Sequence, residues 1–143
     1  MNGSKQLRMM IAATLLATAS GFAVADNDTC KNVRFRVTNE HSTGKVIKIT
    51  GVTYDDLVNN KTVTKDLAAL DCDIHATCVT SDKDLHDVEG NNIKNIHFVF
   101  RYKEHDGDWS DKVKSKGFDP EKKECRADRI YGAAPTGFVI GGS

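Results

Sequence analysis

Three stretches of the chain alternate between apolar and polar side chains with a period of two. They are residues 33–37, 47–54 and 96–102. Such alternation is typical of β-strands that bury one face and expose the other. The pattern therefore predicts a chain built mainly of strands, with the apolar positions of each stretch facing a common core.

The second stretch changes parity near its middle. Ile47 and Ile49 share one face, whereas Val52 and Tyr54 fall on the other. A β-bulge inserts one extra residue into a strand and reverses the side on which later residues lie, and glycine is a common residue at such a site. Gly51 is therefore predicted to form a bulge that returns both pairs to the core.

Between and after these runs the pattern is more mixed. The turn-forming pair at 59–60 separates residues 57–58 from 62–64, which predicts a second strand pair. Residues 65–70 favour one helical turn, although a run of this length is too short to be stable alone. Residues 81–92 are rich in Asp, Glu, Gly and Asn and are interpreted as a loop.

A hairpin is predicted around Asp106-Gly107, because this dipeptide is a strong signal for a two-residue turn. That turn places Phe100 opposite Val113 and puts Trp109 on the same buried face. The other predicted pairs are His105 with Asp108, Lys103 with Ser110, Arg101 with Lys112, Val99 with Lys114 and Phe98 with Ser115. The turn and the hydrophobic pattern thus agree on one register.

These elements indicate an all-β fold. The Phe-x-Phe-x-Tyr run at 98–102, the Asp-Gly turn and the following Trp-Ser pair resemble hairpins of immunoglobulin- and fibronectin-like sandwiches. Several short strands separated by turn signals are also typical of that architecture. We expect a small disulfide-bonded β-sandwich in which the tail from about residue 119 is less regular and either holds a last short strand at 138–140 or frays.

The first 25 residues have the three parts of a secretory signal peptide. Lys5 and Arg8 form a positive start, an apolar stretch follows, and Ala23-Val24-Ala25 fits the small-residue cleavage rule. The apolar stretch is shorter than the roughly 20 residues that span a bilayer. We therefore expect cleavage after Ala25, a single domain at 26–143, no transmembrane segment, and a secreted or periplasmic location.

Charge excludes one class of partner. The chain has 20 basic and 20 acidic side chains, and removal of Lys5 and Arg8 leaves 18 against 20. A near-neutral domain lacks the global positive field that attracts nucleic acid. Binding driven by charge must then come from a local patch.

The four cysteines are Cys30, Cys72, Cys78 and Cys125. An even number in a short exported chain indicates a disulfide framework. We favour Cys72–Cys78 with Cys30–Cys125. Chain entropy does not separate the pairings, because the loop model gives about 7 kcal/mol for this one and about 8 kcal/mol for Cys30–Cys72 with Cys78–Cys125.

Neither a metal nor another cofactor is expected. The spacing of Cys72, His75 and Cys78 lacks the paired C-x-x-C of structural zinc sites. The acidic stretch 106–111 lacks the glycine and the distal glutamate of an EF-hand loop. No nucleophile or hydrolase motif is present, and the neighbouring pairs at 86–87 and 105–106 are not ready-made catalytic dyads.

The predicted hairpin carries basic side chains on its polar face. They are Arg101, Lys103, Lys112, Lys114 and Lys116, with His97 beside them. Like charges directly opposite each other destabilise a sheet, so such a row is suited to an anion. The alternative is a solvated edge, since lysine blocks unwanted strand pairing. Trp109 is either a packing residue or an exposed residue that stacks on a ligand.

These features favour an exported, non-enzymatic binding module. Its expected partner is a protein, a glycan or an anionic lipid surface, bound through the basic hairpin face or through Trp109. A secreted membrane-active effector or toxin-like domain is the alternative. A small secreted hydrolase comes third.

Overall fold

The computed structural model describes residues 30–85, 88 and 92–141, so the predicted signal peptide at 1–25 lies outside the described residues. The described chain is all-β and contains no helix. Its strands are β1 (Arg34–Glu40), β2 (Ile47–Asp56), β3 (Lys61–Cys72), β4 (Thr77–Val79), β5 (Ile93–Tyr102), β6 (Val113–Lys114), β7 (Ile130–Tyr131) and β8 (Phe138–Gly141).

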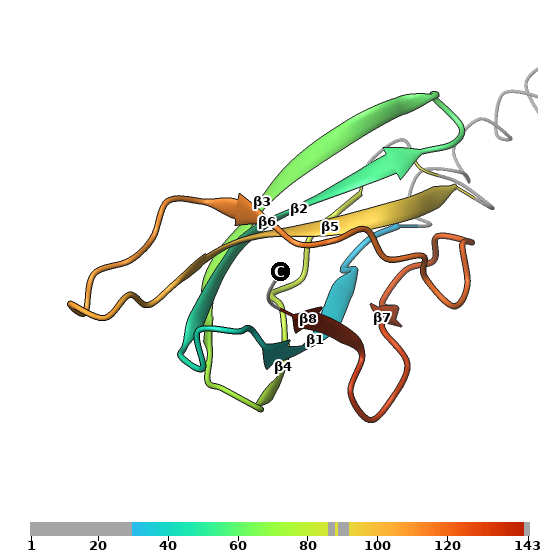
Figure 1. The fold of residues 1–143 in the computed structure, drawn as a ribbon. Helices are drawn as coiled ribbons and strands as arrows, with labels where there is room; N and C mark the ends of the chain where they lie inside the picture. Colours follow the sequence, from blue (N-terminus) through green and yellow to red (C-terminus); the bar gives the residue numbers. More distant parts are fainter. Residues whose placement is uncertain (1–29, 86–87, 89–91, 142–143) are drawn as a thin grey trace, which may run out of the picture.

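The strands form two sheets that lie in two layers (Figure 1). The hairpin sheet has the order β3-β2-β5-β6 and is antiparallel throughout. In the β1 sheet, β1 pairs with β4 in an antiparallel sense and with β7 and β8 in a parallel sense. The last two strands therefore return to the first, and β8 confirms the short strand predicted at 138–140.

Aromatic side chains join the two layers. Phe98 of β5 contacts Phe35 of β1 edge to face, with ring centres 5.7 Å apart, and Phe138 of β8 at 5.8 Å. Phe35 also stacks on Tyr131 at 5.9 Å, while Phe118 packs on Phe138 at 5.2 Å. Phe35 and Phe98 belong to the alternating apolar positions that the sequence pattern identified, whereas Phe118, Tyr131 and Phe138 are added to the core by the fold.

The bulge predicted at Gly51 is confirmed. The register of β2 shifts between Ile49 and Gly51 against both of its neighbours, and the two residue pairs flanking the shift are fully buried. Close approach explains the glycine, because a Cβ at position 51 would lie 3.0 Å from the carbonyl oxygen of Lys65.

Two local predictions were wrong. Residues 65–70 are not a helical turn but part of β3, where Asp66 pairs with Gly51 and Leu70 with Ile49. Pairing along the whole of β2 outweighs a weak local helix preference. In addition, Leu57 and Val58 belong to the turn and are exposed, because β2 and β3 already pair at Asp56 and Lys61.

Both disulfides have the favoured pairing, Cys30–Cys125 and Cys72–Cys78, and no described cysteine is free. Cys72 is the last residue of β3, whereas Cys78 lies in β4. The short bridge therefore joins the edge of one sheet to the edge of the other. The long bridge joins the start of the described chain to the segment before β7.

Candidate binding surface

The β5–β6 hairpin keeps the predicted register at its centre. Val99 pairs with Lys114 and Phe100 with Val113. Ser115 exchanges hydrogen bonds with Phe98, as predicted: its amide donates to the Phe98 carbonyl, and its hydroxyl oxygen accepts the Phe98 amide, both at 2.9 Å.

A second serine uses the same hydrogen-bond pattern nearer the tip. The amide of Ser110 donates to the Tyr102 carbonyl at 2.9 Å, and its hydroxyl oxygen accepts the Tyr102 amide at 3.0 Å. Each serine hydroxyl then donates to the carbonyl of the residue that follows it. Both serines are buried. At each end of the two-residue strand β6, a serine hydroxyl oxygen thus takes the place of a backbone carbonyl as the acceptor for a β5 amide.

Because the Ser110 hydroxyl takes the place of a backbone acceptor, the strand pairing at the hairpin tip is shifted by one residue from the predicted register. Lys103 pairs with Trp109, not with Ser110, and the Glu104 amide donates to the Asp108 carbonyl. The predicted pairs Lys103–Ser110 and His105–Asp108 are therefore wrong. The tip closes from Glu104 to Asp108, and Gly107 adopts a φ of 91°, which glycine reaches without steric cost.

The shift moves Trp109 to the outer face of the hairpin sheet. It does not pack beside Phe100, as the sequence predicted, because it now lies opposite Lys103. The ammonium groups of Lys48 and Lys103 lie 4.5 and 4.6 Å from the centre of the indole ring. Cations at such distances are attracted by the negative ring face. The ring is half-buried beneath them.

Lys48 was not among the residues predicted from the sequence. It lies on β2, where it pairs directly with Arg101 of β5. Its only signal in the sequence is a polar position between Ile47 and Ile49, which indicates an outward side chain without identifying its neighbour. The pairing of β2 with β5 brings a second cation, in addition to Lys103, to the ring of Trp109.

We define the cationic face as Lys48, Arg101, Lys103, Lys112 and Lys114, together with Trp109. Lys112 and Lys114 are exposed in and beside β6. Asp71 lies 3.8 Å from Lys48, and the Arg101 guanidinium donates to the Ser110 carbonyl at 3.3 Å. Within the described residues, no carboxylate forms an ion pair with the other four cations of this face.

The structure does not place Lys116 with this group. Its ammonium lies 5.4 Å from the centre of the Phe118 ring, at the open edge between the two sheets. His97 also has a local role, because its Nδ1 lies 2.7 Å from the Ser115 carbonyl oxygen. The basic residues predicted to share one face therefore divide into the cationic face near Trp109 and two residues with other contacts, Lys116 and His97.

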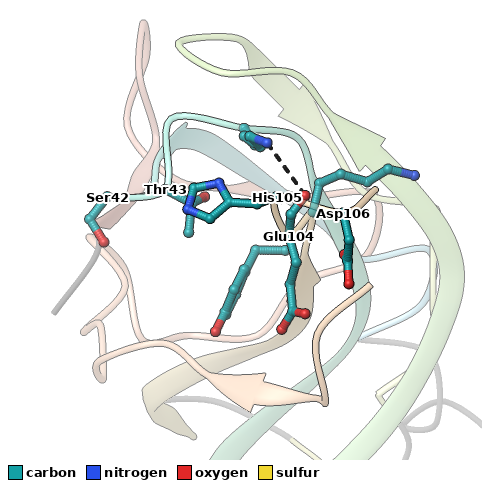
Figure 2. A pocket seen from close by; sticks show the side chains of 8 residues that line it. Ser42, Thr43, Glu104, His105 and Asp106 are labelled. Atoms are coloured by element: carbon teal, nitrogen blue, oxygen red, sulfur yellow. Dashed lines mark hydrogen bonds between the residues drawn. The ribbon is translucent and has the colours of Figure 1, made fainter. Parts of the chain in front are cut away.

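A hollow of about 550 Å³ lies at the tip of the hairpin, next to the cationic face (Figure 2). Ser42 and Thr43 line one side of it, and Glu104, His105 and Asp106 line another. No hydrogen bond joins His105 to either carboxylate within the described part of the chain. The hollow therefore contains ionisable groups without a paired acid and base.

The histidine between the bridged cysteines has a different partner. Nδ1 of His75 lies 2.8 Å from a carboxylate oxygen of Glu40, and both side chains are exposed. Among the described residues, no group of three or more His, Cys, Asp or Glu side chains is arranged to hold a metal ion. The pair at 86–87 lies outside the described residues.

Comparisons with known proteins identified no matching protein family, no similar curated protein and no similar solved structure. Within the described residues, no helix has the length and apolar character needed to cross a membrane. The geometry of the described residues is thus the basis for any functional assignment.

Proposed function

We propose that this chain is an exported, non-enzymatic binding module that recognises an anionic surface through the cationic face. The observation that carries the proposal is the placement of Lys48 and Lys103 over the Trp109 ring, with Arg101 paired to Lys48 and with Asp71, among the described residues, as the one carboxylate paired to the cationic face. A ligand with regularly spaced negative charges would neutralise these cations, and the indole would provide flat contact area.

The energetics of the free protein favour this interpretation. Like charges on directly paired residues such as Lys48 and Arg101 destabilise a sheet by roughly 0.2–1 kcal/mol. A cation–π contact at an exposed site stabilises the folded protein by about 0.5–1 kcal/mol. The arrangement is thus close to neutral for folding alone, whereas an anion would be attracted to every cation at once.

Export and the finer fold class belong to the same proposal. The sequence at 1–25 supports a cleaved signal peptide, and two disulfides are suited to an oxidising compartment, either extracellular or periplasmic. The two layered sheets support an immunoglobulin- or fibronectin-like sandwich as the scaffold.

Retention on heparin and co-sedimentation with vesicles containing phosphatidylserine test the proposal. We expect the mature protein to bind at least one matrix at 0.01 M salt and to be released towards 0.15 M, because the Debye length falls from about 30 to about 8 Å. Replacing Arg101, Lys103 and Lys112 by Gln should abolish retention. Stability should change little, since the relief of like charges offsets the lost contact of Lys103 with Trp109.

A matched control carries Lys61→Gln, Lys122→Gln and Lys123→Gln. These exposed lysines lie outside the cationic face, so the net charge changes equally while the face stays intact. An equal loss of retention in both variants would show that binding depends on net charge and not on the cationic face. If the wild-type protein binds neither matrix at low salt, the cationic face is only a solvated sheet edge and the proposal is wrong. Dye leakage from the vesicles would favour a membrane-active effector, and turnover of ester, phosphate or glycoside substrates would favour a hydrolase.

A further inference from the structure

A second concave region, the side cleft, lies at the open edge between the two sheets. Its volume is about 500 Å³, within the range of roughly 300–1,000 Å³ that is typical of small-molecule sites. Residues of the β1–β2 loop, β5, β6 and β8 line it. They include His41, Ser42, Tyr102, Lys114, Lys116 and Val139.

One wall of the side cleft is aromatic. The His41 ring stacks on Tyr102 with ring centres 4.8 Å apart, and it meets Phe100 edge to face at 5.4 Å. Tyr102 is half-buried, and its hydroxyl has no hydrogen-bond partner among the described residues. The wall therefore combines flat apolar rings with a polar group that remains available to a ligand.

The polar groups of the cleft are cations and hydroxyls. Lys114 and Lys116 line its β6 side, and Ser42 and Thr43 line its loop side. No described carboxylate is among its lining residues. The local charge is therefore positive, in contrast to the tip hollow with Glu104 and Asp106.

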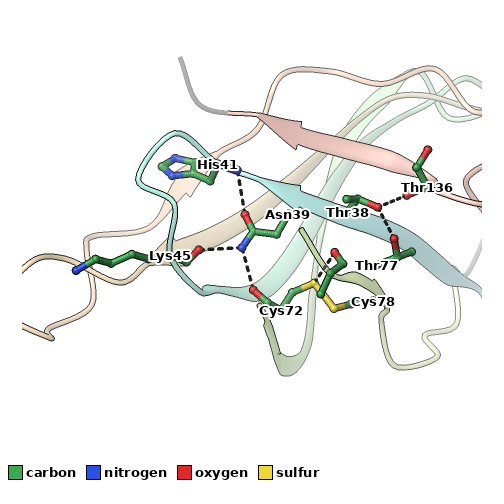
Figure 3. The surroundings of a disulfide bond; sticks show 9 residues. Thr38, Asn39, His41, Lys45, Cys72, Thr77, Cys78 and Thr136 are labelled. Atoms are coloured by element: carbon green, nitrogen blue, oxygen red, sulfur yellow. Dashed lines mark hydrogen bonds between the residues drawn. A yellow bond between two sulfur atoms is a disulfide. The ribbon is translucent and has the colours of Figure 1, made fainter. Parts of the chain in front are cut away.

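A buried amide anchors the loop that forms this wall. The side-chain nitrogen of Asn39 donates to the carbonyls of Lys45 and Cys72, each at 2.9 Å, and its oxygen accepts the His41 amide at 3.0 Å (Figure 3). Asn39 is fully buried. The loop is thereby tied at both ends, next to the Cys72–Cys78 disulfide, so the position of His41 is set before any ligand binds.

We propose that the side cleft binds one unit of an acidic saccharide, with a sugar ring against Tyr102 and its carboxylate or sulfate at Lys114 and Lys116. Aromatic rings suit the C–H face of a sugar, and hydroxyl side chains suit its hydroxyl groups. A lipid chain would need a deeper apolar site than this mixed, open cleft. Lys114 belongs to both the cleft and the cationic face, so a longer acidic chain continues around β6 to Trp109.

This inference rests on the proposed function in taking the ligand to be anionic, but it concerns an adjoining site that shares only Lys114 with the cationic face. The test is an NMR titration of the oxidised mature protein with tetragalacturonate, a heparin-derived tetrasaccharide and neutral maltotetraose. The first two probes separate carboxylate from sulfate recognition. We expect at least one acidic probe to shift the signals of His41 and Tyr102, and maltotetraose to leave them unchanged.

Two variants locate the binding. Val139 lies on β8 and is 37% exposed, so Val139→Trp should fill the cleft and abolish tetrasaccharide binding without disturbing the core. Lys116→Gln should weaken binding about tenfold, whereas the matched change Lys123→Gln should have no effect. The cationic-face variant with Gln at 101, 103 and 112 should retain binding of tetragalacturonate in the titration, although it loses retention on heparin, because a single unit held in the cleft binds too weakly to hold the protein on a column.

The outcomes separate the two proposals. If neither acidic probe moves the His41 and Tyr102 signals, or if Val139→Trp binds as well as the wild type, the cleft assignment is overturned while heparin retention still tests the cationic face. If tetragalacturonate binds in the cleft but the protein is retained on neither heparin nor vesicles, the proposed function fails and the cleft assignment stands.

Discussion

The ammonium group of Lys48 lies 4.5 Å from the centre of the Trp109 ring, although the two residues come from β2 and from the segment before β6. Lys103 lies at nearly the same distance from the ring, at 4.6 Å. Trp109 is therefore held by cations on the outer face of the sheet and not by the aromatic core. This relationship predicts a particular energetic cost for its removal.

Replacing Trp109 by Ala should cost only about 1–2 kcal/mol of unfolding free energy, because two exposed cation–π contacts contribute about 0.5–1 kcal/mol each. Urea denaturation of the wild type and the variant provides the measurement. As a comparison, Phe98→Ala in the core should cost about 3–5 kcal/mol. A Trp109 variant as unstable as the Phe98 variant would show that the indole is a core residue.

Ser110→Ala and Ser115→Ala should each cost about 1–3 kcal/mol, because each leaves a β5 amide without its acceptor. The affected amides belong to Tyr102 and Phe98. Ser42→Ala is the matched control, since Ser42 is exposed in the β1–β2 loop. Denaturant unfolding checks the values, and hydrogen exchange at the amides of 98 and 102 should accelerate in the respective variant. Equal stability of all three variants would contradict the proposed role of the serine hydroxyls.

The two disulfides should differ in their contribution to stability. Cys30 and Cys125 are 95 residues apart in sequence, whereas Cys72 and Cys78 are 6 apart. In the loop-entropy model the long bridge contributes about 4.7 kcal/mol and the short one about 2.4 kcal/mol. Thermal unfolding of the paired Cys→Ala variants should therefore rank the long bridge as the more stabilising. The opposite order would indicate that joining the β3 and β4 edges matters more than loop length.

Stability should fall as the pH decreases below the ordinary histidine value of about 6.5. Partial burial against Tyr102 and Phe100 lowers the pKa of His41, so the unfolded chain binds a proton more readily than the folded one. Unfolding is then favoured between the ordinary pKa and the lowered one. Melting temperatures measured between about pH 7 and pH 5 should decline less steeply in His41→Gln than in the wild type.

A control variant and the pH range separate the contribution of His41 from those of other groups. Ser42 is exposed in the same loop and does not titrate, so replacing Ser42 by Ala should leave the pH profile unchanged. The pKa of Glu124 is lowered mainly by its hydrogen bond to Arg126, so its contribution to stability is lost only below the ordinary glutamate value of about 4.3. Identical profiles for the wild type and His41→Gln would assign the acid sensitivity to other groups.

Much of the fold could be predicted from local pattern. The period-two runs identified β1, β2 and β5, and the parity change around Gly51 identified the bulge, because one-sided burial leaves little freedom in which residues face the core. The even number of cysteines indicated two disulfides, although their pairing was only a preference. The apolar positions of β1, β2 and β5 supply much of the core, which also includes residues outside these strands, such as Leu67, Leu85 and Tyr131.

Only the tertiary structure decided the rest. Residues 65–70 became a strand because pairing along β2 outweighed their helix preference. The parallel return of β7 and β8 to β1 has no local signal, since strand order depends on contacts between distant segments.

The candidate site shows the same division. Basic residues on the hairpin were visible in the sequence, but their arrangement was not. The hydroxyl of Ser110 took the place of a backbone acceptor for Tyr102 and moved Trp109 to the outer face. The β2–β5 pairing then added Lys48 to the ring of Trp109. Neither the side-chain hydrogen bond nor the cross-strand neighbour alters the alternation of apolar and polar residues along the sequence. Both can therefore be known only from the tertiary structure.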